Sequence, residues 1–238
     1  DIGVAMGITG TEVAKGSADM ILTDDNFATI VQAVEEGRII YSNIRKFVNF
    51  LLSCNVGEIL VIFITNLLLG PAFTPLRPIQ LLWLNLVTDS FPALALGREK
   101  GEEDIMKHPP RAHDAKILDL KMLGSIINQS VAILIAVFAA FQIGRFVYPD
   151  VMVNAQEQIT AYAGNFSFFP LAGYLPSMGA RTYAFITLIM AELFRAYSSR
   201  SEDYSVFSLG LFSNSTLNKA FLLSFTLTLA VVYRSEEH

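Results

Sequence analysis

The stretch SCNVGEILVIF, from Ser53 to Phe63, places Glu58 inside a run that otherwise has the composition of a lipid-soluble helix. About thirty residues further on, WLNLVTDSFPA does the same with Asp89. An acid at the centre of a membrane helix costs roughly 3 kcal/mol unless a partner offsets that cost. The two stretches therefore predict membrane-spanning helices that carry a functional polar site.

The composition is that of a membrane protein. Of the 238 residues, 53% are hydrophobic and only 16% are charged, and the mean hydropathy is +0.46. The apolar residues come in blocks, not at amphipathic spacing. A net charge of -5 without a basic cluster gives no reason to expect a nucleic-acid partner. The single cysteine, Cys54, excludes a disulfide framework or a cysteine-rich metal site within this chain.

The amino-terminal part differs from the rest. DIGVAMG and SADMILTDD are typical of short strands, and NFATIVQAVEEGRIIYSNIRKFVNF has the apolar spacing of a helix. We predict the end of a cytoplasmic α/β domain over residues 1–30, followed by a stalk helix over 31–46. Asp24, Asp25 and Asn26 are expected to begin that helix, because acids and a capping side chain favour a helix start. The chain starts without Met or a signal peptide, and reads as a piece of a longer protein.

Residues 47–238 are predicted to form a transmembrane domain with five apolar segments. They cover about 47–69, 76–97, 122–146, 180–198 and 220–234. A hydrocarbon core of about 30 Å requires about 20 helical residues. The first three segments meet that length, and the last two are shorter. The fold class expected is an α-helical membrane protein with a bundle of about five transmembrane helices.

The positions of Lys and Arg predict the orientation. They precede the first segment and fill the connections after the second and fourth segments, whereas residues 147–180 contain none. Because short cytoplasmic loops retain basic residues, we expect the amino-terminal end in the cytoplasm and residues 147–180 outside. Arg77, in the turn between the first two segments, is the one exception.

Polar residues of the first two segments are expected to converge. Asn55 and Glu58 share one helix face, as do Asn85, Thr88 and Asp89, because residues three or four apart lie together on a helix. A short turn joins the segments, so the two patches can meet at similar depth. No Arg or Lys is expected beside them, and hard oxygen donors of this kind suit Ca²⁺.

Further residues refine this expected site. Glu192 supplies a third acid from the fourth segment, and Pro92 is expected to leave the second segment locally unwound, freeing carbonyl groups. Gly57 is expected to let another helix approach closely. Polar residues 128–130 are expected to make only interhelical hydrogen bonds. Such bonds do not account for three buried carboxylates, which require a cation or neutralisation.

Three alternatives to a calcium site remain open at this stage. A pump for Mn²⁺ or another cation would use similar oxygen ligands. A secondary transporter or channel with buried acids would need no phosphorylation domain. A membrane module that binds a regulatory peptide would have no cation affinity.

Several motifs in order, GVAMGITGTEVAKGSADMILTDDNFATIVQAVEEGR, SCNVGE, QLLWLNLVTDSFPALALG and DIMKHPPR, resemble the carboxy-terminal part of a P-type ATPase. The similarity is to calcium-transporting members of the sarco/endoplasmic-reticulum type and their bacterial relatives. It implies that the five segments are family helices five to nine, preceded by the haloacid-dehalogenase-like end of the phosphorylation domain. It also implies an ATP-driven cycle through a phosphorylated aspartate.

The resemblance implies a set of metal ligands. These are Asn55 and Glu58 on the fifth family helix, Asn85, Thr88 and Asp89 on the sixth, and Glu192 on the eighth. It assigns no catalytic or cofactor-binding residue to this chain, because the DKTG, TGES and GDGVND motifs are missing. The nucleotide-binding and actuator domains and helices one to four and ten are missing as well.

The whole pump implied by the resemblance would hydrolyse ATP with Mg²⁺ and export Ca²⁺ from the cytoplasm, with protons as counter-ions. This chain alone would not be catalytic. Its partners would be the lipid bilayer and the missing remainder of the pump. It would be a multi-pass protein of the plasma membrane in a bacterium, or otherwise of an intracellular store membrane.

Overall fold

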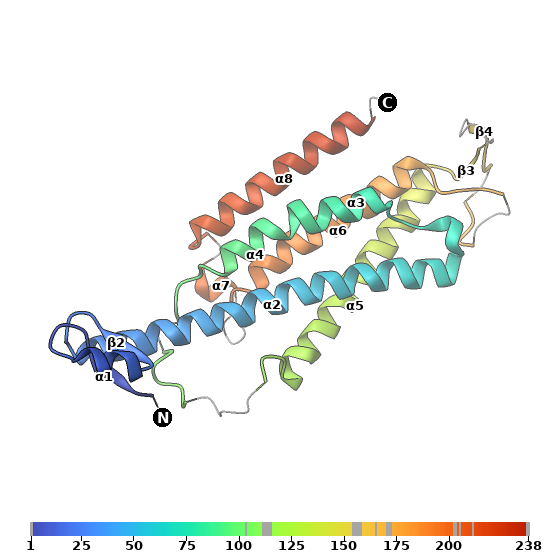
Figure 1. The fold of residues 1–238 in the computed structure, drawn as a ribbon. Coiled ribbons are helices and arrows are strands. Elements are labelled where there is room, and N and C mark those ends of the chain that lie inside the picture. The colour runs from blue at the N-terminus through green and yellow to red at the C-terminus, as the bar shows by residue number, and fades with distance from the viewer. Residues whose placement is uncertain are drawn as a thin grey trace. The chain divides into compact units, whose positions relative to one another are not determined.

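The computed structural model describes residues 2–102, 104–110, 116–153, 159–164, 166–169, 173–201, 204, 206–210 and 212–236. The chain is mostly helical (Figure 1). It divides into two compact units, Asp1–Ile44 with Lys100–His113, and Arg45–Glu99 with Asp114–His238. This division differs from the domain boundaries expected from the sequence, because residues 100–113 join the amino-terminal unit.

The first unit contains a small parallel sheet. Strand β1 (Val4–Met6) pairs with β2 (Met20–Leu22), so that Val4 lies opposite Met20. Both predicted strands are therefore confirmed. Between them lies α1 (Glu12–Ser17), a short helix that the sequence analysis did not foresee, although its cap residue Thr11 is a recognisable start signal.

Two of the three polar residues before α2 (Ala28–Leu69) support its start, as predicted. The Asn26 side-chain oxygen accepts a hydrogen bond from the Ala28 amide at 3.0 Å. The Thr29 hydroxyl donates to the Asp24 carboxylate at 2.6 Å. Both bonds orient the first turn of the helix.

Asp25 has a different role from the one predicted. Its carboxylate accepts hydrogen bonds from the amides of Ile8 and Thr9, at 2.8 and 2.7 Å, and it adopts a φ of 51°. The Ile8 amide, followed by the Thr9 hydroxyl, holds the pKa of Asp25 below its ordinary value. Asp25 therefore fastens the loop after β1, and helix capping was the wrong interpretation of this residue.

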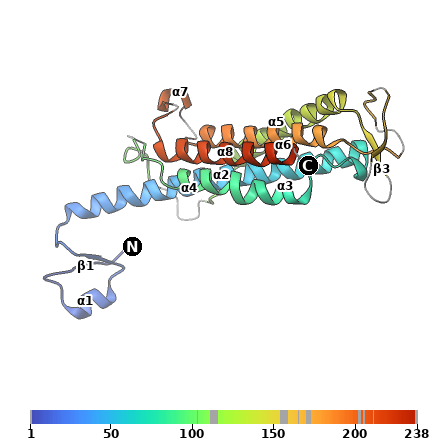
Figure 2. The same ribbon diagram turned by 90° about the horizontal axis from the view of Figure 1, so that it is seen from above.

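The second unit is built from long helices and includes α2 from Arg45 onward. Helix α2 runs without a break for 42 residues, as the helical pattern predicted. The next segment contains α3 (Pro78–Trp83), a π-helical turn (Leu84–Thr88) and α4 (Ser90–Leu96). Then follow α5 (Leu120–Val147), α6 (Met178–Ser198) and α8 (Ser215–Glu236). Figure 2 shows α8 alongside α4, its main contact.

Short elements connect these helices. A 3-10 turn (Pro71–Phe73) follows α2, and α7 (Val206–Leu209) precedes α8. Between α5 and α6, strands β3 (Val151–Val153) and β4 (Ile159–Tyr162) pair antiparallel.

Four stretches in the described part of the chain are long and apolar enough to cross a membrane. They are Ala28–Leu69, Pro78–Leu96, Leu120–Val147 and Ser215–Tyr233. Helix α6 forms where the fourth segment was expected, but it contains Arg181, Glu192 and Arg195. That α6 crosses the membrane as a fifth span stays a prediction.

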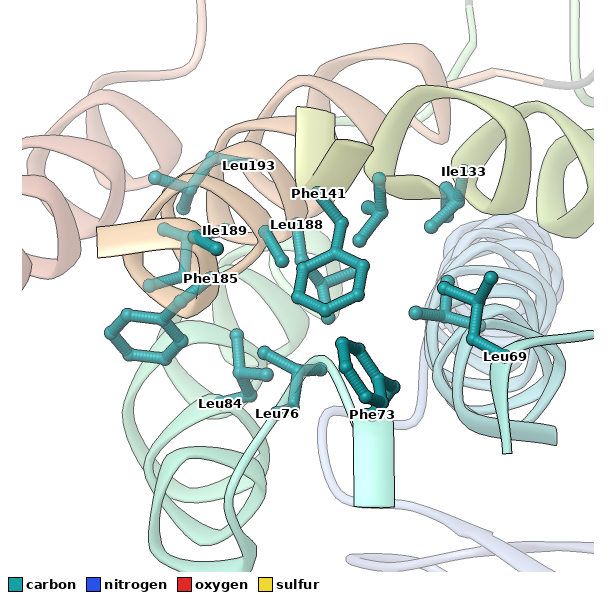
Figure 3. Close-up of a cluster of buried hydrophobic side chains, with 14 residues drawn as sticks. Leu69, Phe73, Leu76, Leu84, Ile133, Phe141, Phe185, Leu188, Ile189 and Leu193 are labelled. Carbon is teal, nitrogen blue, oxygen red and sulfur yellow. The ribbon is translucent and has the colours of Figure 1, made fainter. Parts of the chain in front are cut away.

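An apolar core joins the helices of the second unit. In Figure 3, Phe73 and Leu76 after α2 point toward Phe141 of α5 and Leu188 of α6. All four side chains are buried. Because lipid is as apolar as these side chains, close packing stabilises such a bundle more than removal from water does.

A buried ion pair lies at the carboxyl end of α5. The Arg145 guanidinium binds the Asp150 carboxylate at 2.6 Å, and its side chain is fully buried. It also donates to Gln142 at 2.8 Å and to the carbonyl of Phe168. Arg145 therefore brings no uncompensated positive charge to the edge of the 147–180 segment, which is predicted to lie outside.

Helices α5 and α6 approach closely at Gly144. A Cβ there would lie 2.8 Å from the Cα of Ala180 and 3.0 Å from the Cβ of Tyr183. We predict that Gly144→Val separates the helices and destabilises the protein by about 1–3 kcal/mol through overpacking. Thermal unfolding in detergent measures this effect.

Gly124→Val is the matched control, because Gly124 lies on the same helix with no atom within 4 Å of a Cβ. Both changes introduce the same β-branched residue. Equal melting temperatures for the two variants would contradict the close approach of α5 and α6.

Candidate functional site

Helix α2 and the following segment meet at Glu58. The Asn85 amide nitrogen donates to both carboxylate oxygens of Glu58, at 3.3 and 3.0 Å. It also donates to the carbonyl of Leu81 at 3.0 Å, which fixes its position on its own helix. The polar patches of the first two segments therefore meet, as their spacing predicted.

Two further acids lie together beside this pair. Single ligand atoms of Asp89, Glu192 and Cys54 all lie within 4.8 Å of one another. Asp89 is 1% exposed and Glu192 is fully buried. Glu58 is close enough to repel both carboxylates electrostatically. Three helical segments thus bring three acids into one buried cluster.

Neither Asp89 nor Glu192 has a hydrogen-bond partner for its carboxylate oxygens among the described residues. Buried carboxylates without partners are costly unless a cation or a proton neutralises them. Such a cluster can bind a cation through hard oxygen ligands.

The remaining two candidate residues differ in their positions. The Thr88 hydroxyl is buried next to Asp89 and has no partner in the described structure. Asn55 is only partly buried, and its amide nitrogen donates to the carbonyl of Leu51 on its own helix at 2.8 Å. Thr88 therefore keeps a buried hydroxyl without a partner among the described residues, whereas the Asn55 amide nitrogen already bonds its own helix.

The second segment is widened, not unwound, at this site. The Asp89 amide bonds the carbonyl of Leu84, five residues back, at 3.0 Å. Local unwinding was therefore the wrong expectation, although the irregularity falls just before Pro92, as foreseen. Pro92 has no N–H to give to an upstream carbonyl. The Ser224 hydroxyl of α8 donates instead to the carbonyl of Val87, at 3.2 Å.

Cys54 is the member of the cluster that the sequence analysis missed. It is fully buried on α2 and lies four residues before Glu58. That spacing places both side chains on one helix face, so the same rule that grouped Asn55 with Glu58 could have found it.

A cation also lies closer to the cluster than expected. Arg195 follows Glu192 by three residues on α6 and is 5% exposed. Its guanidinium donates to the side-chain oxygens of Ser53 at 3.2 Å and Asn49 at 3.1 Å, both on α2. The expectation that no Arg would accompany the acids was wrong, because α6 carries Arg195 inward with Glu192. Neutral oxygens, however, accept its hydrogen bonds.

Two packing predictions are confirmed nearby. The Ser130 hydroxyl of α5 donates to the carbonyl of Ser53 at 2.9 Å, an interhelical bond of the kind expected. A Cβ at Gly57 would lie 3.2 Å from the side chain of Ile133. Gly57 therefore lets α5 approach the helix that carries Glu58.

Residues 73–235 match the family model described as "Cation transporting ATPase, C-terminus". This chain belongs to the cation-transporting ATPases. The predicted P-type ATPase family is thereby confirmed, and a secondary transporter or channel is not supported.

Named relatives agree with this assignment. The chain is 41% identical over 239 residues to calcium-transporting ATPase 1 of Bacillus cereus and 43% over 233 residues to a calcium-transporting ATPase of Bacillus subtilis. It is 41% identical over 242 residues to an endoplasmic reticulum calcium ATPase of Aspergillus fumigatus. Each alignment covers 98% of this chain but only 23–25% of the relative. The chain thus spans about a quarter of the length of these relatives.

We predict that the Arg195 contacts hold α6 against α2. Arg195→Met should lower the free energy of unfolding by about 1–3 kcal/mol, because it leaves buried polar atoms of α2 unpaired. The double change Arg195→Met/Asn49→Ala should lower the free energy of unfolding by less than the sum of the two single changes. The difference should be at least about 0.5 kcal/mol. Thermal unfolding of the single and double variants measures this coupling.

Arg98→Met serves as the control, because Arg98 is exposed. It should change stability little. Strictly additive effects of Arg195→Met and Asn49→Ala would contradict a shared network.

Proposed function

We propose that this chain forms the cation-binding transmembrane part of an ATP-driven pump that exports Ca²⁺ from the cytoplasm. The observation that carries the proposal is the buried cluster of Glu58, Asp89 and Glu192, in which the last two lack any hydrogen-bond partner among the described residues. A divalent cation would offset the cost of burying these charges together.

The proposed ligands supply the chemistry that Ca²⁺ prefers. Ca²⁺ takes six to eight oxygen ligands. Six residues are proposed to contribute them, namely Asn55, Glu58, Asn85, Thr88, Asp89 and Glu192. Asn85 has a second task, because its amide group orients the Glu58 carboxylate while its own oxygen remains available for a cation.

The curated relatives support Ca²⁺ as the cargo, since their names describe calcium-transporting ATPases. In the whole pump, ATP and Mg²⁺ would bind outside this chain, in the nucleotide-binding and phosphorylation domains. The transport cycle would change the access to the cluster from one side of the membrane to the other.

Protons are the proposed counter-ions. After Ca²⁺ leaves, the acids of the cluster remain in a dry site, where a carboxylate favours its neutral form. Proton uptake would therefore accompany cation release. The proposed orientation places the amino-terminal end in the cytoplasm, in a bacterial plasma membrane or an intracellular store membrane.

A second candidate cargo is another cation: Mn²⁺ would use the same oxygen ligands, and a softer divalent cation would also use sulfur. Cys54 supports the softer cation, because its thiol lies within 4.8 Å of carboxylate oxygens of Asp89 and Glu192. Sulfur ligands favour softer metals over Ca²⁺.

We predict that removing a single carboxylate abolishes high-affinity Ca²⁺ binding. Glu58→Gln, Asp89→Asn and Glu192→Gln should each weaken binding at least about tenfold in the intact parent pump, since each removes a charged ligand. Equilibrium binding of radioactive Ca²⁺ at low concentration measures this directly.

Glu36→Gln is the matched control, because Glu36 is an exposed acid on the same helix as Glu58. Its Ca²⁺ affinity should equal that of the unaltered pump. Normal binding by all three cluster variants would disprove the assignment of the cation site.

We also predict that Cys54→Ser separates soft from hard cations. The change replaces the sulfur with a hydroxyl and leaves the proposed oxygen ligands in place, so Cd²⁺ affinity should fall on the order of tenfold while Ca²⁺ affinity changes less. Competition between Cd²⁺ and radioactive Ca²⁺ measures both. An unchanged Cd²⁺ affinity would mean that Cys54 only fills space.

A further inference from the structure

A buried ion pair joins the ends of three helices of the second unit. Glu99 follows the end of α4, Arg200 follows the end of α6, and Asn214 directly precedes α8. Figure 1 and Figure 2 both show these helix ends together on one side of the bundle. Under the predicted orientation this is the cytoplasmic side. We call Glu99, Arg200 and Asn214 the clamp.

Short hydrogen bonds hold the members of the clamp together. The Arg200 guanidinium donates from two nitrogens to the two carboxylate oxygens of Glu99, at 3.1 and 2.8 Å. The Asn214 amide nitrogen donates to the same carboxylate at 2.6 Å. Arg200 also donates to the carbonyl of Gly210 at 2.8 Å and to the hydroxyl of Ser213 at 2.7 Å. The side chains of Arg200 and Glu99 are only 3% and 9% exposed, so the paired charges are largely removed from water.

Helical hydrogen bonds lead from the clamp to Asp89 of the cation cluster. The Ala93 amide bonds the carbonyl of Asp89, and the Gly97 amide bonds the carbonyl of Ala93, both at 3.0 Å. The helix thus continues to within two residues of Glu99. At 1.5 Å of rise per residue, Glu99 lies about 15 Å along the helix from Asp89.

Helix α6 connects the clamp to Glu192 in the same way. It runs to Ser198, and the Arg200 amide still bonds the carbonyl of Tyr197 at 3.3 Å. Arg200 therefore lies about 12 Å along the helix from Glu192. Because a helix is stiff over this length, a shift between the two charged residues of the clamp would also shift Asp89 relative to Glu192.

A packed layer lies between the clamp and the cation cluster. Its buried members come from four helices and include Cys54 of α2, Leu96 of α4, Ala196 of α6 and Leu217 of α8. Cys54 also belongs to the cation cluster. Close-packed interiors transmit a displacement instead of absorbing it. The layer therefore couples the position of the clamp to the position of the acids.

The chemistry of the clamp favours positioning over stability as its role. Removal of two charges from water offsets much of their attraction, so apolar residues of similar size would stabilise these helix ends as well or better. A bidentate arginine–carboxylate pair, however, fixes both distance and orientation. Asn214 adds the third helix, because its side-chain oxygen accepts from the Leu217 amide at 2.9 Å in the first turn of α8 while its nitrogen binds Glu99.

We propose that the clamp sets the separation of Asp89 and Glu192 and thereby the affinity of the cluster for its cation. Its members are positioning residues and not ligands, since the ion pair lies about 12–15 Å along the helices from the acids. The inference rests on the proposed function, because a positioning role requires that the cluster binds a cation.

The test is equilibrium binding of radioactive Ca²⁺ to the intact parent pump, well below the melting temperature of every variant. Glu99→Gln and Arg200→Gln should each weaken binding at least about threefold, less than the tenfold or more expected when a group that touches a ligand is lost. Glu99→Gln/Arg200→Gln should weaken binding by less than the product of the two single factors, because either change alone opens the same ion pair.

Asp150→Asn is the matched control for stability. It also neutralises the acid of a buried ion pair, since the side chains of Arg145 and Asp150 are 0% and 8% exposed, but α5 carries no proposed ligand. This variant should lower the melting temperature and leave Ca²⁺ affinity unchanged. A loss of affinity equal to that of Glu99→Gln would overturn the proposal, because it would then follow from general destabilisation.

Asn214→Ser tests the clamp with a milder change. Serine keeps an oxygen to cap α8 but removes the nitrogen that donates to Glu99. Ca²⁺ binding should weaken about twofold. If the charged variants do not fold, normal Ca²⁺ affinity in Asn214→Ser overturns the proposal. If they fold, normal affinity in both Glu99→Gln and Arg200→Gln overturns it.

Failure of the proposed function would give a different result. In that case Asp89→Asn and Glu192→Gln bind Ca²⁺ as the unaltered pump does. If these two variants lose Ca²⁺ binding while Glu99→Gln and Arg200→Gln keep it, the cation site stands and only the positioning role is wrong.

Discussion

The constraint on which the second unit depends is the burial of acids that have no hydrogen-bond partner among the described residues. Asp89 and Glu192 lie in the interior of a helix bundle, and in the described structure neither carboxylate accepts a hydrogen bond. Packing alone would favour smaller, neutral residues at these positions. The bundle therefore has to hold charged groups near one another until a cation or protons neutralise them.

The surrounding structure supplies that support from outside the cluster. Arg195 donates to Asn49 and Ser53 of α2, so it fastens α6 without neutralising Glu192 in an ion pair. Ser130 adds a bond from α5 to the same turn of α2. The close approach at Gly57 leaves little room for α5 to move relative to α2. The acids are thus free to bind a cation because other polar groups hold the helices together.

The π-helical turn joins packing to the proposed function. Widening the helix at Leu84–Thr88 brings Asp89 to the junction with α4, next to the buried Thr88 hydroxyl. Irregular turns of this kind frequently lie at functional sites in helices. The hydrogen bond from Ser224 to Val87 extends this support to α8.

The sequence by itself determined the class of the protein and most of the candidate site. Blocks of apolar residues predicted the membrane helices, and spacing of three or four residues predicted that Glu58 and Asn85 would meet. Local rules of this kind work because helix geometry fixes which side chains share a face. Only the tertiary structure decided the position of Arg195, since its partners Asn49 and Ser53 lie on a helix far away in the sequence. It also decided that the second segment widens and does not unwind. The Ser224 hydroxyl of α8 donates a hydrogen bond to the Val87 carbonyl of that segment, and such a contact depends on how the helices pack.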